Sequence, residues 1–243
     1  MILAVGWLSL GQVGAADRDQ IETLGPPGQP RTYRAFVPET AGRTAPAPAI
    51  VLYNGSGSRV DGLVNAWRAT ASAEGIVLLG PTAFAPGAWR IPQDSPEFTR
   101  EVVEAAKAKF PINPRRVYLF GHSGGAHHSL QLGVLEAEYF AAVAVHAGAL
   151  LPEFVPALAR VRRQVPIGLW IGLDDTVVPP MYVRQTYEVL QREGFPVRLT
   201  EMKKHGHNFA ERADEVVQQA WKFLRDQHLR KDPVYQPYKF GGA

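Results

Sequence analysis

Residues 117–125 read Val-Tyr-Leu-Phe-Gly-His-Ser-Gly-Gly, an apolar run that ends in a Gly-X-Ser-X-Gly turn. A strand that turns sharply into a helix crowds its own backbone, and the two outer glycines remove the Cβ atoms that would clash. Such a turn holds Ser123 in a strained conformation with its Oγ atom above the carboxyl edge of the sheet. The amide of Gly124 faces the same way and can donate to a developing oxyanion. The stretch predicts a strand, a tight turn and a helix, with Ser123 as a candidate nucleophile.

Length and composition fit one large α/β domain. The chain has 243 residues, of which 46% are hydrophobic and 20% charged, as in an ordinary globular enzyme. The formal net charge is +3, and the basic residues are scattered rather than gathered in a stripe, so we expect no nucleic-acid partner. The absence of cysteine excludes disulfides, thiolate nucleophiles and cysteine-ligated zinc.

The N-terminal segment resembles an export signal. Residues 1–16 carry no charged side chain and end in Val13-Gly14-Ala15-Ala16, which is similar to a signal-peptide cleavage site. No Lys or Arg precedes the apolar run, and an apolar strand or helix packed on the domain is the alternative. The run is too short to span a membrane. We expect a signal peptide at 1–16, a periplasmic or secreted protein, and no membrane span.

Beyond this segment, strand and helix patterns alternate. The expected strands and helices are the following: strands at 31–37, 49–53, 76–79, 117–120, 140–145, 166–171 and 197–202, and helices at 63–74, 98–110, 125–136, 181–193 and 210–227. The alternation in 31–37 suits an outer antiparallel strand, whereas the apolar run 49–53 suits a buried parallel one. The βαβαβ order predicts an α/β fold with a mostly parallel central sheet and helices on both faces. We expect a single domain over 17–243, with an extended tail from about 230.

A serine nucleophile needs a base and a group that orients the base. In an open α/β sheet these groups sit at the carboxyl ends of later strands. Asp174 and Asp175 follow the strand 166–171, and His205 and His207 follow the last strand. The chain order Ser, Asp, His is the one expected for this architecture. The residues alone leave both pairs open.

The sequence resembles α/β-hydrolase esterases of the polyhydroxybutyrate depolymerase-like and feruloyl-esterase-like group. The resemblance covers about residues 31–227 and rests on four motifs. These motifs are Leu52 to Gly57, Ile112 to Gly125, Gly172 to Pro179 and Gly206 to Phe209. The sequence departs from the group in lacking cysteines and in having Asn54 where a histidine often precedes the oxyanion glycine.

The resemblance implies a complete set of site residues. It selects Asp175 over Asp174, because Gly172 precedes it and Val178-Pro179 follows it, and His207 over His205. It also implies an oxyanion hole formed by the amides of Gly124 and Ser56. The implied activity is that of a serine carboxylic ester hydrolase with an acyl-enzyme intermediate and neither a cofactor nor a metal.

Two other classes of function stay open. A peptidase of the prolyl-oligopeptidase type shares the triad order, although this chain has no propeller domain. A non-catalytic binding protein on the same fold would be expected to have lost a triad member, and none is lost.

The substrate is the least determined part. Only about twenty residues separate strand 140–145 from the next strand, so we expect no large cap domain and an open site. An open site suits a small-molecule or polymer-linked ester. Trp89 in the loop 80–96 and His146 at the end of strand 140–145 are candidate substrate-binding residues.

Overall fold

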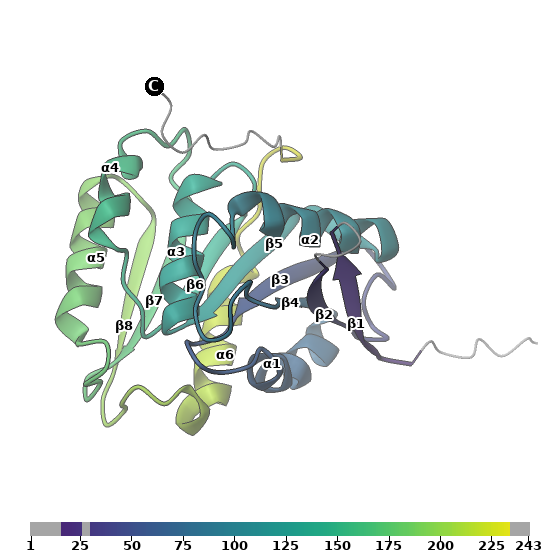
Figure 1. Ribbon diagram of the computed structural model, residues 1–243, viewed down its shortest axis with the longest axis horizontal. Helices are drawn as coiled ribbons and strands as arrows, with labels where there is room; N and C mark the ends of the chain where they lie inside the picture. The colour runs from purple at the N-terminus through teal and green to yellow at the C-terminus, as the bar shows by residue number, and fades with distance from the viewer. Residues whose placement is uncertain (1–15, 26–29, 234–243) are drawn as a thin grey trace, which may run out of the picture.

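The computed structural model describes residues 16–25 and 30–233, and its centre is an eight-stranded sheet of order β1-β2-β4-β3-β5-β6-β7-β8 (Figure 1). The strands are β1 Arg18–Leu24, β2 Arg31–Val37, β3 Ala47–Tyr53, β4 Val77–Pro81, β5 Ile112–His122, β6 Ala142–His146, β7 Ile167–Gly172 and β8 Val197–Met202. All pairs from β4 to β8 are parallel, and the pairs β1–β2 and β2–β4 are antiparallel. The predicted mostly parallel sheet is confirmed.

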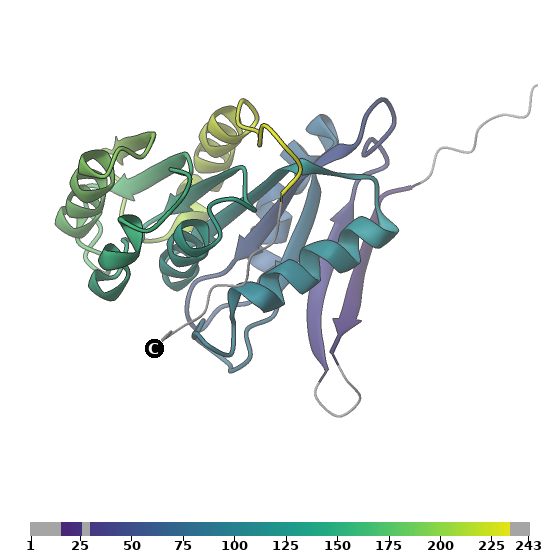
Figure 2. The same ribbon diagram turned by 90° about the horizontal axis from the view of Figure 1, so that it is seen from above.

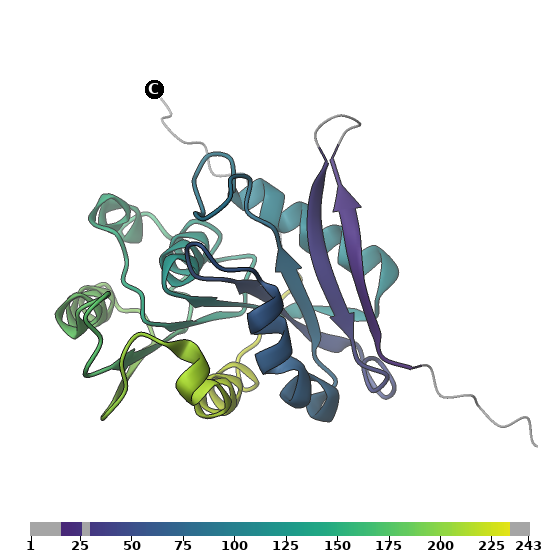
Figure 3. The same cartoon turned by 60° about the horizontal axis from the view of Figure 1, so that its bottom comes forward.

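Helices cover both faces of this sheet. The helices are α1 Asp61–Glu74, α2 Pro96–Lys109, α3 Gly124–Leu135, α4 Val155–Leu158, α5 Pro180–Arg192 and α6 Ala213–Leu224, with short 3-10 turns η1 Pro152–Phe154 and η2 Phe209–Arg212. One hydrophobic core joins the sheet to α2, α3 and α5, and the other joins it to α1 and α6 (Figure 3). Strands β1 and β2 lie at one end of the molecule and α5 at the other (Figure 2). This is the α/β-hydrolase architecture that the sequence predicts.

Strand β3 shows how the sequence divides between the two cores. All seven of its residues are buried. Ala49, Val51 and Tyr53 belong to the core under α2 and α3, whereas Ile50 and Leu52 belong to the core under α1 and α6. A strand with helices on both faces needs apolar side chains at every position, because successive side chains point to opposite faces.

At the N-terminal edge of the sheet, the predicted set of strands is wrong. The strand β1 is missing from the predicted elements, and it makes β2 an inner strand rather than the outer one. The antiparallel pairing of β2 with β4 agrees with the expectation for 31–37, whereas the second antiparallel pair, β1–β2, was not expected. The physical reason is that β1 is exposed or half-buried along its whole length, so no apolar pattern marks it. Its Asp19 is held by ion pairs with Arg34 and Arg68.

The connection after β6 carries no large cap. Between His146 and Ile167 the chain forms only η1 and α4, as the short spacing predicts. Gly148 brings this segment against the elbow helix, since a Cβ atom there would lie 2.3 Å from the Cβ of Ala126. In the described part of the chain, no helix has the length and apolar character needed to cross a membrane. The predicted signal peptide and the end of the predicted tail fall on residues 1–15 and 234–243, outside the described residues.

Candidate active site

Ser123 occupies a strained turn between β5 and α3. Its backbone has φ 55° and ψ −119°, in the region that L residues rarely adopt, and its amide donates to the carbonyl oxygen of His146 at 3.0 Å. A Cβ atom on Gly121 would lie 2.2 Å from the carbonyl oxygen of Gly125, and one on Gly125 would lie 2.0 Å from that of Tyr53. Both glycines are therefore required by close backbone packing, as the sequence predicts.

Three side chains from three strand ends meet at this turn. The Nε2 atom of His207 lies 2.8 Å from the Oγ atom of Ser123, and its Nδ1 atom lies 2.8 Å from Oδ2 of Asp175. The Oδ1 atom of Asp175 accepts from the amides of Val177 at 2.9 Å and Val178 at 2.8 Å. The carboxylate is buried, whereas 21% of the His207 side chain is exposed. A fixed carboxylate on Nδ1 leaves Nε2 free to accept the hydroxyl proton.

The two alternative residues do not reach the serine. Asp174 is exposed on the turn after β7. His205 is buried, and its Nε2 atom lies 2.9 Å from Nε2 of His146. Asp175 and His207, the pair that the family resemblance implies, are the ones hydrogen-bonded in line with Ser123.

The loop after β3 lies against the elbow. A Cβ atom on Gly124 would lie 3.2 Å from the Ser56 amide nitrogen, and one on Gly55 would lie 3.3 Å from the Ser123 Cβ atom. Because Gly124 is the first residue of α3, its amide has no partner within the helix. The amides of Ser56 and Gly124 thus lie close together beside the serine, where two donors could bind one oxygen.

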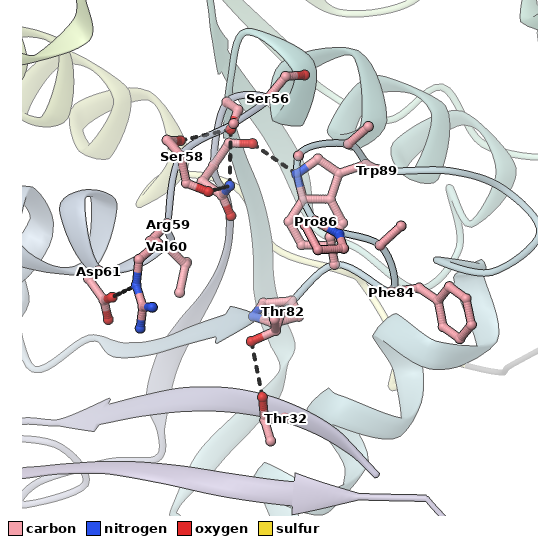
Figure 4. Close-up of a pocket in the computed structure, with 18 of the residues that line it drawn as sticks. Thr32, Ser56, Ser58, Arg59, Val60, Asp61, Thr82, Phe84, Pro86 and Trp89 are labelled. Carbon is pink, nitrogen blue, oxygen red and sulfur yellow. Dashed lines mark hydrogen bonds and ion pairs between the residues drawn. The ribbon is translucent and has the colours of Figure 1, made fainter. Parts of the chain in front are cut away.

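The loop between β4 and α2 and the loop after β3 enclose a cavity of about 560 Å³. Figure 4 shows Ser56, Ser58 and Trp89 around one part of it, with Phe84 farther along the same loop as Trp89. The lining mixes hydroxyl side chains such as Ser56 and Ser58 with apolar ones such as Phe84 and Trp89, so this cavity has a wall of mixed character.

Trp89 also fixes that wall to the rest of the fold. Its Nε1 atom donates to the Asn54 carbonyl oxygen at 2.8 Å. Its ring stacks on the ring of His128, with centroids 5.2 Å apart, and meets the edge of Tyr53 at 4.8 Å. Trp89 therefore lines the cavity and also holds the loop after β3 against α3. Its contact with a substrate stays a prediction.

The expected substrate contact of His146 needs correction. Its side chain is completely buried and offers no surface to a ligand. It bridges two other histidines, with its Nδ1 atom 3.0 Å from Nδ1 of His122 and its Nε2 atom 2.9 Å from Nε2 of His205. The ring of His122 in turn lies beside His207, with centroids 5.0 Å apart.

This histidine chain, made of His122, His146 and His205, is held neutral. Burial lowers the pKa of all three side chains, and the pKa of His122 falls to about 4. The Nδ1 atom of His205 has no hydrogen-bond partner among the described residues. If His205 donates to His146 and His146 donates to His122, the Nδ1 atom of His205 carries no hydrogen and is an acceptor. This arrangement leaves no buried donor unpaired. The sequence motifs do not predict this chain, although the His-X-His spacing after the last strand is a signal for it.

The loop between β4 and α2 is organised by a buried carboxylate that the sequence motifs do not reveal. Asp94 is completely buried between β4 and α2, where it pairs with Arg31 at 2.7 Å. Its two oxygens also accept from the amides of Phe84 at 2.8 Å and Arg90 at 2.9 Å. One carboxylate thus shapes the loop that carries Trp89. Within the described ranges, no group of three or more His, Asp or Glu side chains is arranged to hold a metal ion.

The fold and the serine-centred site together define a serine hydrolase of the α/β-hydrolase class. The chain belongs to the phospholipase/carboxylesterase family, whose model matches residues 89–228 and so spans Ser123, Asp175 and His207. The resemblance to α/β-hydrolase esterases is thereby confirmed. No curated protein matches the sequence at a significant level.

Solved structures share the fold at low identity. An S-formylglutathione hydrolase from Agrobacterium tumefaciens is 15% identical with a TM-score of 0.65, and the match covers 86% of this chain and 96% of that chain. A ferulic acid esterase from Anaeromyces mucronatus is 15% identical with a TM-score of 0.68, covering 89% and 92%. An acylaminoacyl peptidase from Pyrococcus horikoshii is 12% identical with a TM-score of 0.68, covering 91% of this chain and 44% of that chain.

Proposed function

We propose that the protein hydrolyses carboxylic esters through a covalent acyl-enzyme on Ser123. The observation that carries the proposal is the continuous run from Asp175 Oδ2 through the His207 ring to Ser123 Oγ, with both hydrogen bonds at 2.8 Å. A serine hydroxyl is a weak nucleophile by itself, and a neutral imidazole held in the right tautomer activates it.

The first half of the reaction forms the acyl-enzyme. The Oγ atom of Ser123 attacks the ester carbonyl carbon while its proton passes to Nε2 of His207, and the carbonyl oxygen becomes an oxyanion. The amides of Ser56 and Gly124 donate to that oxyanion. The ester C–O bond then breaks, and the imidazolium returns the proton to the departing alcohol.

The second half releases the acid. A water molecule gives a proton to His207 and attacks the acyl carbon, and the C–Oγ bond breaks as Ser123 regains the proton. Asp175 stabilises the imidazolium in both halves, and the amides of Val177 and Val178 hold its carboxylate in place. Every proton is returned, so the cycle needs no cofactor.

A hydrolysis screen tests the proposal. Acetyl, feruloyl and hydroxybutyrate esters and peptide amides are offered to the wild type and to Ser123→Ala. We expect turnover of at least one ester class, reduced about 10⁴- to 10⁶-fold in the variant. Cleavage of peptides alone would favour the peptidase alternative, and no turnover of any substrate would favour the non-catalytic one.

A further inference from the structure

A second cavity, of about 470 Å³, opens on the α3 and α5 face of the sheet. Its walls come from α3, the segment after β6, the loop after β7, and α5, and they are mainly aliphatic. Leu150, Val155, Val178, Tyr182 and Val189 are among the lining residues. Its volume lies within the range of about 300–1,000 Å³ that is usual for small-ligand sites.

This aliphatic cavity begins at residues that are tied directly to the site. His127, at its α3 wall, lies one helical turn beyond the nucleophile and donates its amide to the Ser123 carbonyl oxygen at 3.1 Å. Val178, at another wall, donates its amide to Asp175. The cavity therefore adjoins the helix that begins at the nucleophile and the loop that carries Asp175.

Hydrogen bonds fix the walls of the cavity in place. The Nδ1 atom of His127 lies 2.6 Å from the Ala149 carbonyl oxygen, which joins the post-β6 segment to α3. The hydroxyl of Thr186 accepts from the Leu150 amide at 3.0 Å and donates to the Tyr182 carbonyl oxygen at 2.9 Å, which joins the same segment to α5. A cavity held in this way is formed before a ligand arrives, so binding costs little ordering of the walls.

Exposed apolar side chains gather at the same place. Val177 is 65% exposed, Tyr182 50% and Val155 36%, and all three line the cavity. Met181, next to Tyr182, is 52% exposed. A group of large apolar residues left in water around a cavity indicates that an apolar ligand covers them.

We propose that the aliphatic cavity binds a hydrocarbon acyl group of the ester, and that Val155 limits its length. The inference rests on the ester hydrolysis proposed above. The acyl group stays attached to Ser123 while the alcohol leaves and water enters, so it is the part that benefits from a preformed wall. The other cavity, around Ser56 and Ser58, then receives the alcohol.

Two matched ester series test the inference. One series varies the acyl chain of p-nitrophenyl esters from acetate to octanoate, and the other varies the alkyl chain of acetate esters. For the wild type we expect kcat/KM to rise about fourfold with each added acyl CH2 until the cavity is full. The alkyl acetate series should show no such rise.

Val155→Trp should fill the cavity mouth without disturbing the fold, because Val155 is partly exposed on a short helix. We expect this variant to lose more than about tenfold in kcat/KM on the octanoate ester and little on the acetate ester. Ala159→Trp is the matched control, because Ala159 is exposed one turn further on and does not line the cavity. The control should keep the wild-type chain-length profile.

Three outcomes would overturn the acyl assignment: a flat acyl series in the wild type, a rise in the alkyl series instead, or equal losses on acetate and octanoate in Val155→Trp. Failure of the proposed function looks different. In that case the wild type would hydrolyse neither acetate nor octanoate, and Ser123→Ala would behave as the wild type does.

Discussion

At the scale of single residues, the site depends on one carboxylate chosen from two neighbours. Asp175 is buried against His207 and two amides, whereas Asp174 is exposed one position earlier. The peptide between them turns the two side chains to opposite environments. Adjacent identical side chains therefore have very different roles in the proposed reaction.

Asp175→Asn should lower kcat by about 10⁴-fold with little effect on folding, because an amide can donate to Nδ1 and stabilise the wrong imidazole tautomer. Asp174→Asn is the matched control and should keep wild-type kcat. Steady-state ester hydrolysis by the two variants measures the difference. Equal losses in both variants, or a loss only in Asp174→Asn, would contradict the assignment.

The histidine chain makes a second prediction at this scale. His146→Leu leaves His122 Nδ1 and His205 Nε2 without their partner and should lower the free energy of unfolding by about 1–3 kcal/mol for each buried group left unpaired. It should also lower kcat, since His122 packs against His207. His146→Gln, which keeps one donor and one acceptor, should recover part of both losses. Denaturant unfolding and kcat measure these effects, and a leucine variant as stable and active as the wild type would refute the role.

At the scale of elements, loops converge on the elbow and are held there by a few side chains. Trp89 joins the β4–α2 loop to the loop after β3 through the Asn54 carbonyl and to α3 through the His128 ring. The amide of Ser56 lies two residues after Asn54. Its position therefore depends on a contact from a different loop.

Trp89→Phe should keep the ring contacts and remove the hydrogen bond to Asn54. We expect kcat to fall roughly three- to tenfold with a smaller change in KM, because a donor that stabilises the oxyanion loses its support. Trp221→Phe on α6 is the matched control, since its Nε1 atom has no hydrogen-bond partner among the described residues. An unchanged kcat in Trp89→Phe would show that the hydrogen bond does not position the loop.

The elements differ in how well the sequence predicts them. The strand β8 has the predicted bounds 197–202, and β7 differs by one residue at each end. An apolar run marks β7, and alternating apolar and polar residues mark β8. The strand β5 extends from 112 rather than 117. Ile112 pairs with Ala47 and Val117 with Ala49, so the turn-forming residues Asn113 and Pro114 lie within an irregularity in the register with β3.

The residues of the candidate site also differ in how well the sequence predicts them. The order of strand ends brings Ser123, Asp175 and His207 to one edge of a parallel sheet, so their meeting could be predicted from motifs and topology. The burial of His146 and the role of Asp94 could not be predicted, because both depend on which side chains from distant segments surround them.

At the scale of the whole molecule, the sheet with its helices supports two cavities. One belongs to the loops after β3 and β4, and the aliphatic cavity belongs to α3, α5 and the segment after β6. Export through residues 1–16 and the extent of a single domain over 17–243 stay predictions.

The free energy of unfolding should depend on pH because of one buried acid, which lines neither cavity. Glu136, at the end of α3, is 5% exposed, and burial raises its pKa to about 7 from 4.5, with a further contribution from Glu97. The folded state thus keeps a proton that the unfolded state releases between about pH 4.5 and 7, so the free energy of unfolding falls as pH rises through this window.

Glu136→Gln should remove this pH dependence. Its effect on the free energy of unfolding should be about 1–3 kcal/mol more favourable at pH 8 than at pH 4. Glu138→Gln, at an exposed position two residues later, is the control and should leave the pH profile unchanged. Urea unfolding at the two pH values measures the difference. A gain at pH 4 as large as that at pH 8 would contradict ionisation as the cause.

The central claim is that His207 activates Ser123, and covalent labelling by a fluorophosphonate tests it most directly. The reagent reacts with activated serines, and mass spectrometry of the intact chain and its peptides locates the adduct. We predict one adduct per chain on Ser123, none in Ser123→Ala, and labelling slowed by orders of magnitude in His207→Asn. An unlabelled wild type, an adduct on another residue, or equally fast labelling of His207→Asn would contradict the claim.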